Sequence, residues 1–264
     1  MIETKRMGVD SAKRGVYEYW NYGSRFYDHT PGIRHESEDL IWQEELAGVL
    51  GPKPLTVIDV GTGTGYIAMI LGQLGHQVTG VDFSPNMLEI ARERNAPYRS
   101  NVTILEGDAE NLAFPNDAFD ALTARYVLWT QPRPEEAIRE WMRVIKPGGR
   151  MIIIDGFWEM KGFLKNLCRF NFQLYRTLKF GKRLGTDKYQ VDLSRLIPHA
   201  KGIHMEEIVA YLTRSGLEDI TTVVLQRVRD TQKKHAPWYL KYAYDYPTYM
   251  VTGKMPGGTV GHVE

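Results

Sequence analysis

A glycine-rich segment followed by an aspartate is the part of this sequence with the clearest chemical character. Residues 59–65 read Asp-Val-Gly-Thr-Gly-Thr-Gly and join an apolar run, LTVIDV, to a segment of helical length, YIAMILGQLG. Glycines at a strand-to-helix turn let the backbone turn tightly and approach a ligand, with helix N–H groups directed at it. Asp82 ends the next apolar run, at the ~20-residue distance at which a carboxylate meets ribose hydroxyls. Together these features predict a site for a ligand that contains adenosine.

The spacing of the glycines separates two kinds of adenosine ligand. The dinucleotide fingerprint G-x-G-x-x-G would require a glycine where this chain has Tyr66. An acid at position 59 would repel a pyrophosphate, whereas it suits a ligand with a cationic amino-acid end. A nicotinamide-dependent dehydrogenase is therefore the disfavoured interpretation.

Strands and helices alternate around this segment. The pattern predicts strands at 55–60, 76–82, 101–108, 119–130 and 148–157, with helices over 66–75, 84–96 and 134–145 between them. Ser84 and Pro85 have the residue types of a helix N-cap and first helical position. This alternation is typical of right-handed βαβ units and a parallel sheet covered on both faces.

The flanks are expected to decorate this core. Residues 9–50 are predicted to be helical, 157–200 contain no convincing strand, 204–226 resume as helix and strand, 227–245 are irregular, and 246–255 form a last strand. The predicted organisation is an N-terminal helical lid segment (1–50), a ligand-binding core (51–156), a helical basic cap (157–205), the final helix and strands of the core (206–255) and a flexible tail (256–264).

Four segments, taken jointly, resemble one known family. They are VIDVGTGTG, VTGVDFSPNML, GDAENLAFPNDAFD and REWMRVIKPGGRMIIID. Over residues 55–155 the sequence resembles the class I S-adenosylmethionine (SAM)-dependent methyltransferases, in particular the type 11 group that includes the ubiquinone and menaquinone C-methyltransferases. The resemblance implies an α/β fold with a Rossmann-like, seven-stranded, mostly parallel sheet, SAM as cofactor and S-adenosylhomocysteine (SAH) as product.

The resemblance also implies roles for individual residues. The methionine part of SAM would lie on the three glycines with Asp59 near its amino group, and Asp82 would take the ribose hydroxyls. Adenine would lie between apolar side chains and a carboxylate, and the position after the fourth strand would offer a backbone carbonyl. The implied cofactor residues are Asp59, Gly61, Gly63, Gly65, Asp82, Phe83, Met87, Asp108, Ala109 and Arg125.

Methyl transfer from a sulfonium is an in-line displacement with a neutral leaving group. The enzyme must orient the acceptor, exclude water and, for weakly acidic acceptors, remove a proton, and it requires no metal. The catalytic residue is unassigned, with Tyr27, His29 and His199 as candidates, and the substrate-binding candidates are Tyr22, Tyr27, Trp129 and Trp158. The alternative for the aromatic residues is simple packing, and for each histidine a structural role.

Composition and charge bound the remaining classes. The 264 residues carry 33 Lys and Arg against 32 Asp and Glu, which disfavours a general nucleic-acid coater. The lone Cys168 excludes an intramolecular disulfide and a cysteine-clustered metal site. We expect a cytoplasmic protein, because the N-terminus has no apolar signal-peptide core and no apolar run approaches the ~18 residues of a membrane span.

The near-neutral balance hides a segregated charge. Residues 161–201 hold ten basic and two acidic residues, a net charge of +8, so the remaining 223 residues carry −7. If residues 161–180 form a helix, their basic residues fall on one side of it and their apolar residues on the opposite side. This helix could pack on the sheet or on a second subunit of a homodimer, form a lid for an anionic or lipophilic acceptor, or lie on a membrane surface.

The sequence therefore predicts a SAM-dependent methyltransferase that acts on a small-molecule acceptor. Two alternatives stay open. One is a membrane-associated C-methyltransferase of quinone precursors, and the other is a binding protein with the SAM fold and no turnover.

Overall fold

The computed structural model describes residues 2–27, 36–158, 197–237 and 246–257, together with residues 167, 170–171, 174 and 177–178. The basic stripe of the predicted 161–180 helix, His29 and the tail from residue 258 lie outside the described residues.

A seven-stranded sheet organises the chain, with the strand order β3-β2-β1-β4-β5-β7-β6. Strands β1 to β5 are parallel, and β7 runs antiparallel to both β5 and β6. The predicted Rossmann-like, mostly parallel sheet is confirmed. The strands are β1 (Thr56–Val60), β2 (Gln77–Asp82), β3 (Val102–Glu106), β4 (Phe119–Arg125), β5 (Ile145–Gly156), β6 (Glu218–Val224) and β7 (Thr248–Lys254).

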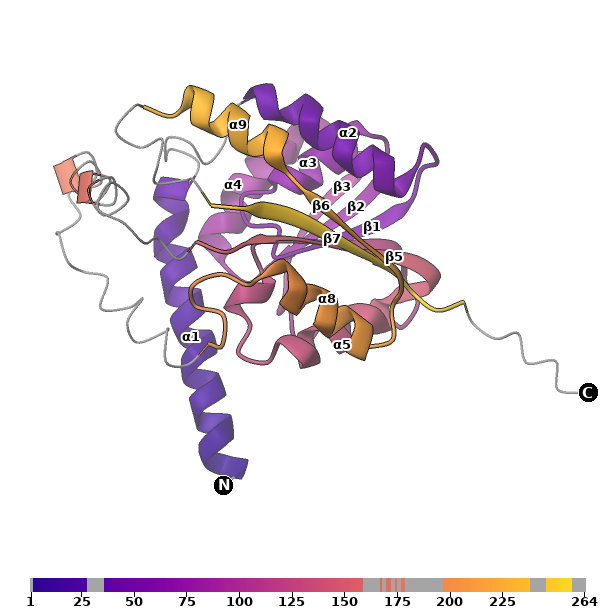
Figure 1. Ribbon diagram of the computed structural model, residues 1–264, viewed down its shortest axis with the longest axis horizontal. Coiled ribbons are helices and arrows are strands. Elements are labelled where there is room, and N and C mark those ends of the chain that lie inside the picture. Colours follow the sequence, from indigo (N-terminus) through magenta and orange to yellow (C-terminus); the bar gives the residue numbers. More distant parts are fainter. Residues whose placement is uncertain are drawn as a thin grey trace, which may run out of the picture.

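Helices cover both faces of this sheet (Figure 1). One face packs against α2 (Asp39–Leu50), α3 (Tyr66–Gln73), α4 (Pro85–Asn95) and α9 (Gln226–His235), and its core includes the buried Trp42 and Leu71. The other face packs against α5 (Pro134–Val144) and α8 (Met205–Arg214), with the buried Trp141 at its centre. The long helix α1 (Ile2–Tyr27) packs against α4. Because both faces are covered, the central strands β1 and β4 are almost wholly buried.

Local sequence features explain several boundaries. The Ser84 hydroxyl accepts a hydrogen bond from the Met87 N–H at 3.3 Å, with Pro85 at the first helical position, so the predicted N-cap of α4 is confirmed. Gly51, with φ of +76°, ends α2. Among the described helices, none combines the length and apolar character needed to cross a membrane.

Three expected boundaries were wrong. Residues 227–235, expected to be irregular, belong to α9 (Gln226–His235). This helix is mostly polar, and its narrow buried side consists of Val228, Arg229 and Gln232. The strand expected over 119–130 ends at Arg125, because Tyr126 adopts φ of +57° and the chain turns into a short 3-10 helix, Leu128–Thr130. The fifth strand begins at Ile145, ahead of the Lys-Pro-Gly-Gly turn, with a register shift opposite Phe119 and Ala121.

Candidate functional site

A cavity of about 450 Å³ opens at the carboxyl ends of the central strands, within the size range of small-molecule sites. Open α/β sheets bind ligands at this edge, where the strand order changes direction. Here β1 lies between β2 and β4, so the loops that follow these strands diverge to opposite faces. The walls come from the loops after β1 to β4 and from one side of α1.

The three glycines of the loop after β1 do different things. All have left-handed backbones, with φ of +63°, +55° and +75° at Gly61, Gly63 and Gly65. A Cβ on Gly61 would lie 2.3 Å from Val127 Cγ2, and one on Gly65 would lie 2.4 Å from Asn95 Nδ2. A Cβ on Gly63 would meet nothing closer than the Gly61 carbonyl, at 3.9 Å. Gly63 therefore keeps open the floor of the cavity, while Gly65 packs against α4 and does not line it.

Two buried carboxylates stand beside this floor. The Asp82 carboxylate accepts hydrogen bonds from the N–H groups of Gly63 and Ser84, both at 2.9 Å. The Asp59 carboxylate accepts from the hydroxyls of Thr62 and Thr123, at 2.6 and 2.7 Å. Burial raises the pKa of both, that of Asp59 to about 6. Both side chains are held in place and line the cavity, as their predicted cofactor roles require.

Apolar and acidic groups together line the end of the cavity away from the glycine loop, near the residues that follow β2 and β3. Phe83 and Met87 line it, and Tyr17 of α1 meets the Phe83 ring edge-on at 5.7 Å. Asp108 and Ala109 follow β3 at the same end. An aromatic base can lie against these apolar side chains while a carboxylate accepts from its exocyclic amine.

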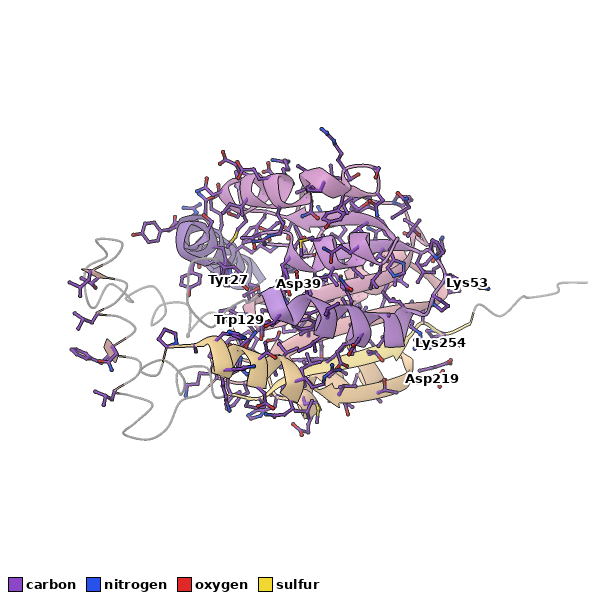
Figure 2. All side chains as sticks on the ribbon, turned by 90° about the horizontal axis from the view of Figure 1, so that it is seen from above. Tyr27, Asp39, Lys53, Trp129, Asp219 and Lys254 are labelled. Carbon is purple, nitrogen blue, oxygen red and sulfur yellow. The ribbon has the colours of Figure 1, made fainter. Side chains whose placement is uncertain are left out.

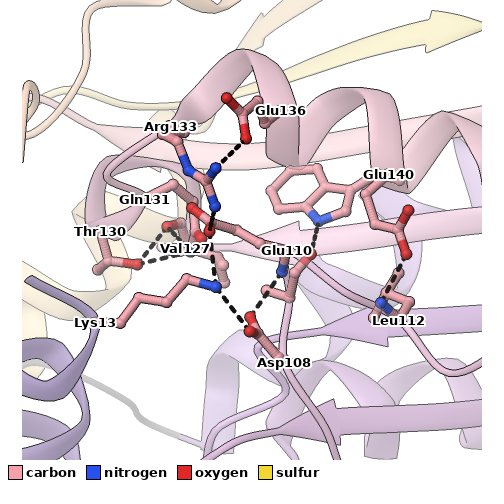
Figure 3. A network of polar contacts seen from close by, with 12 residues as sticks. Lys13, Asp108, Glu110, Leu112, Val127, Thr130, Gln131, Arg133, Glu136 and Glu140 are labelled. Atoms are coloured by element: carbon pink, nitrogen blue, oxygen red, sulfur yellow. Dashed lines mark hydrogen bonds and ion pairs between the residues drawn. The ribbon is translucent and has the colours of Figure 1, made fainter. Parts of the chain in front are cut away.

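An ion-pair network joins α1 to this end (Figure 3). Lys13 Nζ lies 2.7 Å from the Asp108 carboxylate and 2.8 Å from that of Glu110, which Arg133 also contacts at 3.0 Å. Burial alone would lower the pKa of Lys13, but its hydrogen bonds to both carboxylates raise it. Asp108 Oδ1 also accepts from the Glu110 N–H. The network fixes one turn of α1 against the loop after β3.

The predicted substrate and catalytic residues are dispersed. Tyr27 lines the cavity, and Tyr27 and Trp129 lie at the same end of the molecule (Figure 2). Tyr22 is 48% exposed and does not line the cavity. His199 is buried away from it, with Nε2 2.9 Å from the Tyr211 hydroxyl, and burial lowers its pKa.

Aromatic side chains gather next to the cavity. The Trp129 ring packs edge-on against Trp158 at 4.9 Å and against Trp20 at 6.3 Å, and Trp158 also meets Tyr126 and Tyr246. Trp129 Nε1 is buried and has no hydrogen-bond partner among the described residues. Trp129 and Trp158 thus meet in one aromatic cluster, but neither lines the cavity, so their substrate-binding role stays a prediction.

Other residues that line the cavity were not predicted. Most come from α1 or follow β3 and β4, and only the tertiary fold brings them to the site. In α1, Ala12 and Val16 are buried, but nothing in the local sequence shows which residues this side of the helix faces. Within the described residues no cluster of His, Cys, Asp or Glu could hold a metal ion. The unpredicted lining residues include Lys13, Val16, Tyr17, Trp20, Glu106, Thr130 and Gln131.

Comparisons with known proteins agree with this geometry. A family model for a methyltransferase domain matches residues 58–153. The demethylmenaquinone methyltransferase of Thermus thermophilus is 37% identical over 157 residues, which cover 58% of this chain and 70% of that protein. That of Desulfitobacterium hafniense is 35% identical over 147 residues, covering 53% of this chain and 58% of that protein.

A solved structure shares the fold. The Haemonchus contortus phosphoethanolamine N-methyltransferase 2, crystallised with phosphomonomethylethanolamine and SAH, superposes with a TM-score of 0.61 at 18% identity. The superposition covers 89% of this chain and 58% of that one.

The sheet order and the cavity at its switch point define a Rossmann-like α/β protein that binds an adenosine ligand. The chain belongs to the SAM-dependent methyltransferases, in the group that includes the ubiquinone and menaquinone C-methyltransferases. The residues present fit the cofactor: an open floor at Gly63, carboxylates at the ends of β1 and β2, and an apolar far end with Asp108.

Proposed function

We propose that this protein transfers a methyl group from SAM to a small-molecule acceptor. Bound SAM supplies an activated methyl group on a sulfonium. The observation that carries the proposal is the order of three features along one cavity. Gly63 follows β1, the Asp82 carboxylate ends the neighbouring β2, and Asp108 follows β3. In the same order along a bound cofactor these would meet its methionine part, its ribose and its adenine.

The chain's own residues then have three tasks. Asp82 and Asp108 hold the two polar parts of the nucleoside, and the α1 side chains Tyr17 and Trp20 keep water from the cavity. Tyr27 lines the cavity and stays one of the three predicted catalytic candidates, with His29 and His199, for removing a proton from a weakly acidic acceptor. Holding the acceptor in line with the sulfonium is the main remaining contribution, since the leaving group needs no activation.

Cofactor binding tests the first part. Calorimetry with SAH should show binding by the wild type and a loss of at least ~100-fold in affinity for Asp82→Ala, because a carboxylate that accepts from two ribose hydroxyls contributes ~1.5–3 kcal/mol per hydrogen bond. Asp230→Ala, on the exposed side of α9, is the matched control and should bind as the wild type does. Equal affinity in all three proteins would contradict the assignment.

Turnover is tested with the acceptor left open. The protein is incubated with SAM and a metabolite extract, and products that gain one methyl group are sought by mass spectrometry. A product that requires Asp82 supports the enzyme. Cofactor binding with no product and no release of SAH would support the alternative of a binding protein without turnover.

A second candidate acceptor is a lipophilic quinone precursor, which the matched relatives from Thermus and Desulfitobacterium are named for. The supporting observation is that Leu167, Phe170 and Leu178 are 45%, 53% and 78% exposed. With Leu174 they follow the spacing of one helical side, and the basic residues of the same segment would face anionic headgroups. Contact with a membrane surface, a homodimer and a cytoplasmic location all stay predictions.

Vesicle binding checks this candidate. The protein should co-sediment with anionic phospholipid vesicles at low salt, and the double substitution Lys165→Glu and Arg169→Glu should abolish the binding. Glu89→Lys, on α4, reverses a charge elsewhere and serves as the control. Absence of vesicle binding by the wild type at low salt would remove the membrane-surface candidate and leave the methyltransferase proposal intact.

A further inference from the structure

Arg125 is a cationic residue that lines the cavity, and its guanidinium has no hydrogen-bond acceptor among the described residues. It is the last residue of β4 and lines the cavity beside the glycine loop. Its guanidinium carbon lies 5.2 Å from the centre of the Tyr66 ring, 5.4 Å from that of Tyr126 and 5.7 Å from that of Trp42. Within the described part of the chain this guanidinium makes no hydrogen bond and no ion pair.

Such an arrangement suits a ligand with a negative group. The aromatic rings stabilise the charge through their faces but cannot accept the five N–H donors of a guanidinium in its plane. Two other described cations line the cavity. Lys13 is already bonded to the carboxylates of Asp108 and Glu110, and Arg14 is exposed on α1. The buried Glu38 carboxylate accepts a hydrogen bond from Gln232 Nε2 at 3.0 Å. A planar anion that enters the cavity can therefore form the bidentate contact that no described residue makes with this guanidinium.

Asp59, which lies next to Arg125, indicates which class of anionic ligand the site would bind. Strands β1 and β4 pair in parallel with Asp59 opposite Thr123, so Asp59 and Arg125 stand on adjacent strands at the same edge. Thr123 and Asp59 are hydrogen-bonded, which places Asp59 and Arg125 on the same face of the sheet. A negative and a positive group side by side match the ammonium and carboxylate of an α-amino acid, and Gly63 leaves the space above them open.

We propose that Arg125 is the carboxylate anchor for the amino-acid end of the cofactor, with Asp59 stabilising the adjacent ammonium. This inference rests on the proposed function and names a specificity-determining side chain within it. Family resemblance assigned only a backbone contact to this position. Arg125 would select ligands that carry a complete amino acid over adenosine thioethers that lack the carboxylate.

Binding of two ligands by the wild type and by two Arg125 variants tests this selection. The ligands are SAH and its decarboxylated analogue, which differs only in lacking the carboxylate, and the readout is binding by calorimetry. The wild type should prefer SAH by roughly 10- to 100-fold, as expected for a charge-assisted bidentate contact. In Arg125→Met the preference should fall to within about 3-fold, and Arg125→Lys should keep part of it.

The control is a second buried arginine. Arg229 on α9 also lies over an aromatic ring, 4.2 Å from the centre of Tyr246, but it does not line the cavity. Arg229→Met should keep the wild-type preference. Binding of methylthioadenosine, which lacks the whole amino acid, verifies that each variant retains a folded nucleoside site.

The outcomes separate this inference from the proposed function. If SAH binding depends on Asp82 but Arg125→Met keeps the full preference for the carboxylate, the anchor assignment is wrong and the methyltransferase proposal stands. If Arg125→Met leaves SAH binding unchanged and weakens only an acidic acceptor, the anion belongs to the acceptor and the inference is also overturned. If no adenosine ligand binds the wild type, the proposed function itself fails.

Discussion

Gly63→Val is expected to yield a folded protein that has lost SAH binding by more than ~100-fold. The Cβ position at Gly63 faces open cavity, so a valine side chain would occupy the space over which a bound methionine chain must pass. The substitution also places a β-branched residue at φ of +55°, which costs ~1–2 kcal/mol of stability. Calorimetry for SAH binding and thermal unfolding for stability measure the two effects separately.

Gly148→Val is the matched control for this variant. Gly148 has φ of +75°, and a Cβ there also meets nothing within 4 Å, but it lies in the turn within β5, away from the cavity. We expect a similar loss of stability and an unchanged affinity for SAH. Should both variants bind equally well, the floor of the cavity is not where the ligand lies.

Asp155→Asn is expected to remove a large pH dependence of stability. Asp155 is wholly buried at the end of β5, where burial raises its pKa to about 8 although its carboxylate accepts from the N–H groups of Gly156 and Trp129. The unfolded chain releases this proton near pH 4. Between pH 4 and 8 the folded protein therefore holds a proton that the unfolded chain does not, and its stability falls as pH rises, by up to ~1.4 kcal/mol per unit.

The asparagine variant cannot ionise at this position, so its stability should not share that decline. Relative to wild type, its melting temperature should rise by roughly 10 °C between pH 5 and pH 8. Asp120→Asn is the control: although burial acts to raise it, hydrogen bonds from Lys146 and Thr56 hold the pKa of Asp120 at about 2. The difference in melting temperature between Asp120→Asn and the wild type should therefore stay constant between pH 5 and pH 8. Parallel curves for Asp155→Asn and wild type would show that Asp155 is ionised when folded.

The sequence was sufficient for features that rest on local chemistry. Apolar runs that alternate with helical segments predicted the succession of β1 to β5 along the chain. Ser84 with Pro85 predicted the start of α4, because capping depends on neighbours in the chain. Asp59, Asp82 and the glycines were identified because a tight turn and a strand end carry recognisable residue types. The family resemblance added Phe83, Met87 and Asp108 to the cavity lining.

The features that could not be predicted from the sequence depend on contacts between segments that are distant in the chain. Lys13 reaches Asp108 across 95 residues, and no local pattern in α1 indicates that partner. Helix α9 is strongly polar, so its few buried residues gave too weak a periodicity to predict it. The sequence suggested only a backbone contact at Arg125, and the tertiary fold shows that this residue lines the cavity while its guanidinium lies over the rings of Trp42 and Tyr66.

The attachment of α1 through Lys13 has a kinetic consequence. Tyr17 and Trp20 of α1 form part of the cavity wall, and Lys13 fixes that wall to Asp108 and Glu110. For a nucleoside bound between α1 and the loop after β3, we expect these two ion pairs to slow release, because they oppose separation of the helix from that loop. Rising ionic strength, which screens partly exposed ion pairs, would then quicken exchange of spent cofactor and couple the rate of successive turnovers to the salt content of the medium.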